Sequence, residues 1–282
     1  MYNFKFSGFS DEISEKIDVQ FEVLNKLGIE HFEPRGVDGV NISALSDDER
    51  AVLKEKMAQY NIKVSSIGSP IGKIKLSDDF KAHFELFKRV VDTALFLDAK
   101  YIRMFSFYHD GGDEWTDAER CEVFEKLTKL IDYAKEHNII LLHENEKDVY
   151  GDTWARCLDL MENLGCENFR AVFDPANFVQ CEQDTKKAYE ALAPYIEYMH
   201  IKDADESGRV VPAGFGAGNV EYILSDLYKN GYDGFLSLEP HLGSFVGLAD
   251  LELDDAMLSL PQSGESTFTV AFNALKKITE NL

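Results

Sequence analysis

The chain has 282 residues, of which 45% are hydrophobic and 28% are charged, a composition typical of a folded globular protein. Its net charge is −22, and no cluster of Lys and Arg offers a phosphate-binding surface, so the sequence predicts no nucleic-acid partner. No run approaches the roughly 20 apolar residues needed to cross a bilayer, so it predicts no membrane partner either.

Eight short runs rich in β-branched, aromatic and aliphatic residues alternate with amphipathic stretches of helical length. The predicted strands are, in chain order, 4–8, 29–33, 62–68, 101–106, 139–144, 169–174, 198–202 and 235–239. Two of the intervening helices begin with a capping signal, at Ser46 with Glu49 and at Thr116 with an acidic first turn. Several predicted helices stop at Gly or Asn just before the next strand, at Gly28, Asn61, Asn138, Gly165 and Gly231.

Strict alternation of strands and helices predicts a parallel sheet. Eight units of about 35 residues predict its closure into a single (β/α)8 TIM barrel spanning residues 1–282. An open, doubly wound sheet is the alternative. Two connections, 203–218 and 240–265, are longer than ordinary βα loops, and long loops of this kind often bind ligands or cover sites.

The cysteines and the first residues bear on the compartment. Cys121, Cys157, Cys166 and Cys181 have neither CxxC spacing nor a disulfide-like pattern. The opening "MYNFKFSGFSDE" lacks the basic and apolar regions of a secretory signal. We therefore expect reduced thiols in a cytoplasmic protein, and we leave assembly into a homo-oligomer open.

The last four predicted strands end on residues that bind metals. "NIILLHENE" ends on Glu144, "FRAVFDPANF" on Asp174 and "GFLSLEPHL" on Glu239, while "IEYMHIKD" carries His200. The carboxyl ends of barrel strands meet at one rim, where three carboxylates would repel one another without a cation. One imidazole and three carboxylates suit one divalent ion, with Mn²⁺ as first choice and Mg²⁺, Co²⁺ or Zn²⁺ as alternatives.

Each of these residues alone also has a purely structural explanation. Glu144 or Asp174 could cap the helix that follows, and His200 could be a hydrogen-bonded core histidine. Four such residues on adjacent strands favour the metal site over four separate explanations. Lys202 lies two residues beyond His200 and so shares its face, where we expect it to contact substrate.

The motifs "LLHEN", "VFDPANF", "MHIKDA" and "FLSLEPHL" resemble those of the xylose isomerase-like TIM-barrel superfamily, in particular its sugar phosphate isomerase/epimerase family. Segments such as "GFSDEI" and "VSSIGSPIGKI" extend the resemblance into the N-terminal half. The resemblance implies that Glu144, Asp174, His200 and Glu239 are the metal ligands. In the ketose epimerases of this group, the residues that match Glu144 and Glu239 also form the acid/base pair.

Asn177 departs from the pattern of many relatives, which carry a histidine three residues after the strand-six aspartate. Asparagine can hydrogen-bond a substrate hydroxyl but is a poor ligand for a transition metal. This departure, together with the acidic charge, disfavours the multi-metal endonuclease IV branch of the superfamily.

The expected function is that of a divalent-metal-dependent isomerase or epimerase acting on a sugar or sugar phosphate. A carboxylate would remove the proton next to a carbonyl, and the metal would stabilise the enediolate. A hydride shift, as in xylose isomerases, remains open. The alternatives are a metal-dependent dehydratase of the inosose or dehydroshikimate type and a carbohydrate-binding protein with an inactive site.

Further candidates for binding a small carbohydrate substrate lie at or near strand ends. They are Glu33, Arg35, Arg103, Asn177, Lys202, Arg209 and His241. "GSPIGKI" lacks the spacing and the Ser/Thr of a P-loop, and "GFGAGN" does not follow a strand as a dinucleotide fingerprint must. Asn219, at the end of the latter segment, is more simply the N-cap of the next helix.

Overall fold

The computed structural model describes residues 4–111, 114–242 and 263–282. All eight predicted strands are present, although most are one to three residues shorter than predicted. They are β1 (Lys5–Gly8), β2 (His31–Phe32), β5 (Lys63–Val64), β6 (Tyr101–Met104), β7 (Ile140–Glu144), β8 (Phe169–Phe173), β9 (Ile196–Ile201) and β12 (Phe235–Leu238).

Six of these strands form one curled parallel sheet in the order β1-β12-β9-β8-β7-β6, and β2 pairs in parallel with β5. Backbone contacts join the pair to both edges of the sheet. Glu33 N donates to Gly8 O over 2.9 Å beside β1, and Ile67 forms a parallel bridge with Ile102 of β6. The strands thus close into a ring, which confirms the barrel and shows that the open-sheet alternative is wrong.

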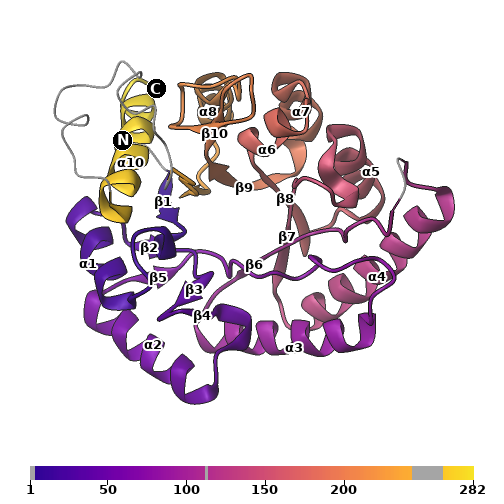
Figure 1. Ribbon diagram of the computed structural model, residues 1–282, viewed down its shortest axis with the longest axis horizontal. Helices are drawn as coiled ribbons and strands as arrows, with labels where there is room; N and C mark the ends of the chain where they lie inside the picture. The colour runs from indigo at the N-terminus through magenta and orange to yellow at the C-terminus, as the bar shows by residue number, and fades with distance from the viewer. Residues whose placement is uncertain (1–3, 112–113, 243–262) are drawn as a thin grey trace.

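Helices surround the strands on the outside (Figure 1). The longer ones are α1 (Ile17–Leu27), α2 (Asp47–Tyr60), α3 (Phe80–Phe96), α4 (Asp117–Glu136), α5 (Trp154–Leu164), α7 (Thr185–Leu192), α8 (Val220–Lys229) and α10 (Gly264–Glu280). Shorter elements are α6 (Pro175–Gln180), η1 (Ser10–Glu12), η2 (Ile42–Ala44), η3 (Tyr150–Asp152), η4 (Ala193–Tyr195) and the strands β3 (Gly36–Val37), β4 (Val40–Asn41), β10 (Asp203–Ala204) and β11 (Val210–Val211). Among the described residues, no helix is both long enough and apolar enough to cross a membrane.

Local sequence signals set several helix ends. Capping boxes form at Ser46 before α2 and at Thr116 before α4, as predicted. Gly28 ends α1 in the left-handed conformation that glycine adopts without strain. Asn219 precedes α8 as predicted, but its side chain does not cap the helix; its amide donates to Thr185 Oγ1 instead.

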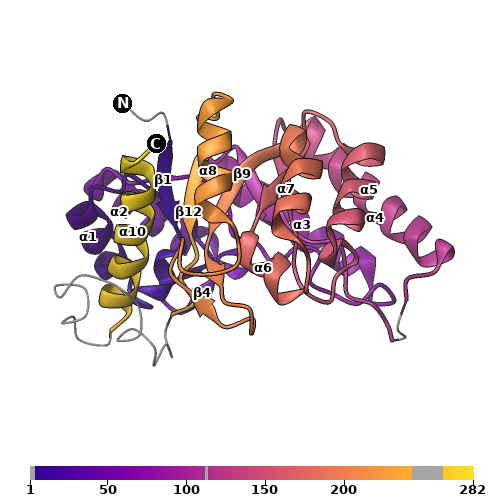
Figure 2. The ribbon, with the colours of Figure 1, turned by 90° about the horizontal axis from the view of Figure 1, so that it is seen from above.

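The alternation of side chains along the strands sorts them into two layers. One face packs against the helices; there Phe6 of β1 meets Phe272 of α10 edge-on, which holds α10 beside β1 (Figure 2). The other face points into the barrel, where a small, separate apolar cluster consists of Ile140, Leu142, Val172 and Tyr198. Residues two positions further along each strand share this inward face, so the apolar cluster lies directly below the strand ends.

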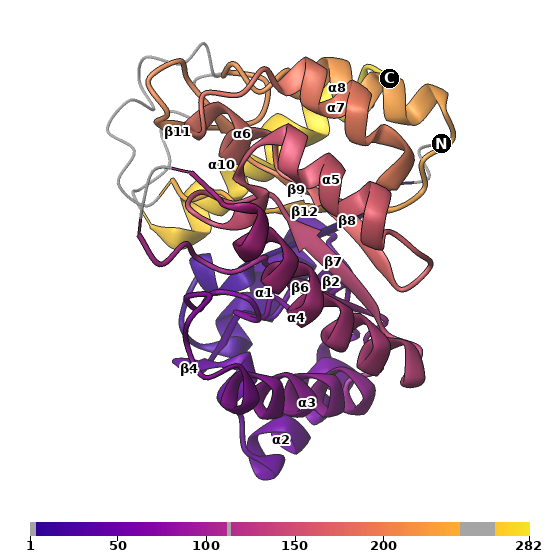
Figure 3. The ribbon, with the colours of Figure 1, turned by 90° about the vertical axis from the view of Figure 1, so that its right-hand side faces the viewer.

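The segments that follow the strands gather at one end of the barrel. Figure 3 shows α6 and β11, which follow β8 and β9, on the same side of the molecule. The predicted loop 203–218 is not irregular throughout, because β10 and β11 form an antiparallel hairpin. Beyond it, the Asp203 carboxylate accepts hydrogen bonds from the backbone N–H groups of Gly214, Gly216 and Gly218. Most of the other predicted long loop, 240–265, lies outside the described residues.

A matched pair of glycine variants tests how tightly this rim is packed. Gly72 and Gly28 have similar positive φ angles, 87° and 75°. A Cβ on Gly72 would lie 2.1 Å from Phe105 O, whereas one on Gly28 meets nothing within 4 Å. Gly72→Ala should therefore lower the free energy of unfolding by about 1–3 kcal/mol more than Gly28→Ala, as measured by urea denaturation. Equal losses would show that the rim relaxes around the added methyl group.

Candidate metal centre

Glu144, Asp174, His200 and Glu239 meet at the carboxyl ends of four neighbouring strands. Glu144 ends β7, Asp174 follows β8, His200 lies in β9 and Glu239 follows β12, and these strands are consecutive in the sheet. One ligand atom from each residue lies within 4.8 Å of the ligand atoms of the others. All four residues are at most 3% exposed. The structure therefore brings together the four residues that the sequence predicts as ligands.

The two carboxylate oxygens of Asp174 have different neighbours. Its Oδ1 accepts a hydrogen bond from Asn177 N and so caps α6, the structural role considered from the sequence. Its Oδ2 is buried and accepts no hydrogen bond, although Lys202 Nζ lies 3.0 Å away. Asn145 holds this strand end in place by exchanging hydrogen bonds with the Asp174 backbone. A buried, unsatisfied carboxylate oxygen fits a cation ligand.

Each carboxylate of the cluster has a basic side chain beside it. Arg103 Nη1 lies 3.1 Å from Glu144, and Arg35 Nη1 lies 3.1 Å from Glu239. Lys202 Nζ lies 3.0 Å from both Asp174 and Glu239 and is only 5% exposed. Lys202 therefore sits inside the cluster, on the face predicted from its spacing to His200.

These contacts give the three carboxyl groups different pKa values. Burial would raise the pKa of Glu144, but His200 and Arg103 outweigh it and lower the pKa to about 2. Burial dominates at Asp174 and raises its pKa to about 7 despite Lys202. At Glu239 the opposing charges of Lys202 and His241 prevail over burial and hold the pKa well below its usual value. Glu144 and Glu239 are therefore ionised at neutral pH, and a bound cation would keep Asp174 ionised as well.

The donor set fits a divalent ion. Three carboxylates and one imidazole are the ligands that Mn²⁺ and related hard or borderline ions take, and Zn²⁺ accepts the same groups. His200 presents Nδ1 to the cluster, 2.9 Å from Glu144 Oε1. Asn177 Nδ2 lies 3.3 Å from the same oxygen and is placed as a hydrogen-bond donor beside the ligands. The described structure thus offers one set of four ligand residues with a polar neighbour.

The remaining predicted site residues lie at different depths. Glu33 is 1% exposed and contacts the far side of the His200 ring. Arg35 pairs with Asp11 as well as with Glu239. The side chain of Arg209 is 59% exposed on the β10–β11 hairpin, where it pairs with Asp205. The structure brings Glu33 and Arg35 to the cluster, whereas the ion pair of Arg209 is with Asp205 in its own hairpin.

His241 lies at the outer edge of the site, with its side chain 42% exposed. Its Nε2 is 3.5 Å from Glu12 and 3.6 Å from Glu239. Ligand atoms of these three residues lie within 4.8 Å of one another, as they do in the main cluster. Arg35, however, already pairs with both Glu12 and Glu239. The position of His241 suits contact with a ligand at the mouth of the site.

Phe9 is a central residue of the site that sequence reasoning missed. It follows β1, is fully buried and meets the His200 ring edge-on at 5.1 Å. The guanidinium groups of Arg35 and Arg103 lie over its ring, 4.8 and 5.0 Å from the centroid. Its ring therefore holds both arginines by cation–π contact. Nothing in "GFSDE" distinguishes such a phenylalanine from one in the core.

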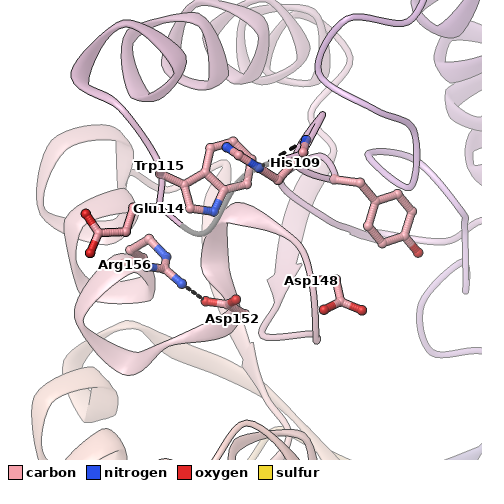
Figure 4. A pocket seen from close by; sticks show the side chains of 8 residues that line it. His109, Glu114, Trp115, Asp148, Asp152 and Arg156 are labelled. Carbon is pink, nitrogen blue, oxygen red and sulfur yellow. Dashed lines mark hydrogen bonds and ion pairs between the residues drawn. The ribbon is translucent and has the colours of Figure 1, made fainter.

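A cavity of about 350 Å³ opens between the β6–α4 and β7–α5 connections (Figure 4). It is lined by Tyr108, His109, Gly111, Glu114, Trp115, Asp148, Asp152 and Arg156. The Asp152–Arg156 ion pair forms one side, and Trp115 lies across from it beside His109. His109 therefore lines this cavity and is not part of the four-residue cluster.

Comparisons with known proteins agree with the barrel fold. A family model described as xylose isomerase-like TIM barrel matches residues 21–258. A curated 3-dehydroshikimate dehydratase from Bacillus anthracis is 23% identical over 130 residues, which is 46% of this chain and 46% of that relative, so the match spans about half of its length.

Two solved structures show the same fold. The IOLI protein with a bound zinc atom has a TM-score of 0.76 and 18% identity over 99% of each chain. D-allulose 3-epimerase from Methylomonas sp. in complex with D-allulose has a TM-score of 0.72 and 17% identity over 100% of this chain and 98% of that one. At such identities the likeness concerns the fold alone.

The ammonium group of Lys202 should stabilise the metal-free protein. Lys202→Met leaves Asp174 and Glu239 buried with less positive charge, so it should lower the free energy of unfolding by about 3–5 kcal/mol. Saturating Mn²⁺ should recover most of this loss, because the ion replaces the missing charge. Lys88→Met, which removes a surface pair with Glu85, is the control and should cost under about 1 kcal/mol. A Lys202 variant that Mn²⁺ fails to rescue would contradict a cation site at these carboxylates.

Proposed function

Because the chain belongs to the xylose isomerase-like TIM barrel family, we propose that it is a divalent-metal-dependent isomerase or epimerase of a sugar or sugar phosphate. One observation carries the proposal. Glu144 ends β7 and Glu239 follows β12, at the two ends of the row of ligands, with Asp174 and His200 between them. Two buried carboxylates on either side of one cation are what proton transfer at both faces of a carbon requires.

The residues have separable roles in this reaction. The divalent ion, when bound, supplies Lewis-acid stabilisation of the charge that develops on the substrate oxygens. Glu239 removes the proton next to the carbonyl, and Glu144, once it has taken up a proton from solvent, would return that proton from the opposite face, while Glu239 later releases its own to solvent. Lys202, 3.0 Å from Glu239, keeps the base ionised, and Arg103 orients Glu144 from 3.1 Å.

A small carbohydrate is the proposed substrate. Support comes from the D-allulose complex of an epimerase with the same fold. Asn177 and Lys202 offer hydrogen-bond donors beside the ligands, with Arg35 and Arg103 next to them and His241 at the mouth. Arg209 remains a prediction for a rim contact, since its side chain is 59% exposed.

The ion and the cellular setting are further parts of the proposal. Mn²⁺ is the first choice from the donor set, and the zinc in a protein of similar fold supports a divalent ion. All four cysteines are free thiols, which agrees with the reducing cytoplasm expected from the sequence. One domain over 1–282 and the homo-oligomer remain predictions.

A dehydratase is the second candidate, and two observations favour it. The curated relative matched over 130 residues is a 3-dehydroshikimate dehydratase. Lys202 Nζ, 3.0 Å from Glu239, also places an ammonium donor next to the base. Glu239 would then remove the proton, and Lys202 would protonate a hydroxyl leaving from the neighbouring carbon as water.

Proton NMR in D₂O separates the two reactions. The Mn²⁺-loaded protein is incubated with D-allulose and with 3-dehydroshikimate, each in a separate tube. An epimerase should give the epimeric ketose with one deuterium at the inverted carbon and no loss of water. Formation of a dehydrated product from 3-dehydroshikimate, with D-allulose unchanged, would establish the alternative instead.

Replacing one ligand at a time separates metal binding from chemistry. Glu239→Gln keeps an oxygen donor but cannot accept a proton, so Mn²⁺ should still bind, more weakly, while turnover falls roughly 10²–10⁴-fold. Asp174→Asn should lose metal and activity together. Metal content and solvent exchange of the substrate C–H are measured on the same preparations. Near wild-type exchange in Glu239→Gln would exclude Glu239 as the base.

A further inference from the structure

Glu33 is a buried carboxylate with an unusual set of contacts. It follows β2, is 1% exposed and lies inside the barrel below the four ligands. Its Oε2 accepts hydrogen bonds from Tyr198 Oη at 2.9 Å and from Ser237 Oγ at 2.7 Å. Ser65 extends this group, since its hydroxyl lies 2.8 Å from Tyr198 Oη. Glu33 is thus held in one orientation by hydroxyl donors from two other strands, β9 and β12.

The charge of Glu33 is directed at His200. The Nε2 atom of that ring lies 3.3 and 3.4 Å from the two carboxylate oxygens. Among the described residues, no lysine or arginine forms an ion pair with Glu33; its only ionic contact there is with His200. A buried carboxylate needs such a partner, so the imidazole N–H is the group that Glu33 is placed to bind.

The two ring nitrogens of His200 therefore face two different environments. Nδ1 lies 2.9 Å from Glu144 Oε1, in the ligand cluster, and Nε2 lies against Glu33 on the opposite side. A carboxylate that accepts the N–H of one ring nitrogen leaves the other nitrogen with its lone pair free for a metal.

We propose that Glu33 is a positioning residue that fixes His200 as an Nδ1 metal ligand, with its Nε2–H donated to Glu33. The proposal rests on the metal centre described above. It gives Glu33 a role different from the substrate contact expected from the sequence. Glu33 acts through His200, from the interior of the barrel, and the hydroxyls of Tyr198 and Ser237 hold it there.

Metal affinity without any substrate tests this role. Mn²⁺ dissociation constants are measured by chelator competition for the wild type, Glu33→Gln and Tyr198→Phe, and the melting temperatures of the metal-free proteins are measured alongside. Glu33→Gln should weaken Mn²⁺ binding by about 10–100-fold, because the amide is a poorer acceptor for Nε2–H. Tyr198→Phe removes another hydrogen bond to the same carboxylate and leaves its contact with His200, so its Mn²⁺ affinity should change less than about threefold.

The possible outcomes distinguish the role of Glu33 from the existence of the metal centre. Tight binding by the wild type with an unchanged affinity in Glu33→Gln would overturn the role of Glu33 and leave the centre intact. An equal loss of Mn²⁺ affinity in both variants would show that Glu33 only contributes to packing and does not position His200. Failure of the wild type to bind Mn²⁺ would overturn the centre and the role together.

A spectroscopic test needs no variant of Glu33. Histidine ring ¹⁵N NMR of the wild type with Zn²⁺, a diamagnetic ion, reports which nitrogen of His200 carries the proton, and a His200→Asn sample assigns the signal. We expect a protonated Nε2 and a metal-bound Nδ1. The opposite arrangement would contradict the proposal.

Discussion

The site is governed by the cost of burying like charges together. Glu144, Asp174 and Glu239 converge within one cluster and are almost entirely shielded from water. Carboxylates packed this closely stay ionised only when positive charge is supplied nearby. Arg35, Arg103 and Lys202 supply part of it, each at about hydrogen-bond distance from a carboxylate, and Asp174 still has an oxygen without a hydrogen bond. A divalent cation would complete this balance, and the same cation would stabilise the charge that forms on a substrate.

The barrel accommodates these buried charges by separating an apolar layer from a polar one. Inward-facing residues low in β7, β8 and β9 form an apolar cluster, and the inward positions further along the same strands carry the ligands. Phe9 and the hydroxyl group of Tyr198 mark the boundary between these layers. Because the ligands stand on strand ends and not on free loops, their mutual geometry is set by the sheet.

The features of the structure that depend on local sequence pattern could be predicted. Strand positions, two capping boxes and the four strand-end residues follow from hydrophobic runs and from residues next to them. What the sequence missed depends on contacts between distant segments. Glu33 and Arg35 lie two residues apart beyond a strand of only two residues, so alternation could not tell that one turns to His200 and the other to Asp11. Phe9 under two arginines likewise reflects tertiary packing, whereas Arg209 pairs locally with Asp205, four residues away.

The central claim is that one divalent ion binds at these four strand ends. Anomalous diffraction at the manganese absorption edge, from crystals grown with Mn²⁺, tests it most directly. The account predicts one strong peak at about 2.0–2.3 Å from ligand atoms of Glu144, Asp174, His200 and Glu239. A crystal saturated with Mn²⁺ that shows no peak there, or a peak coordinated by other residues, would contradict it.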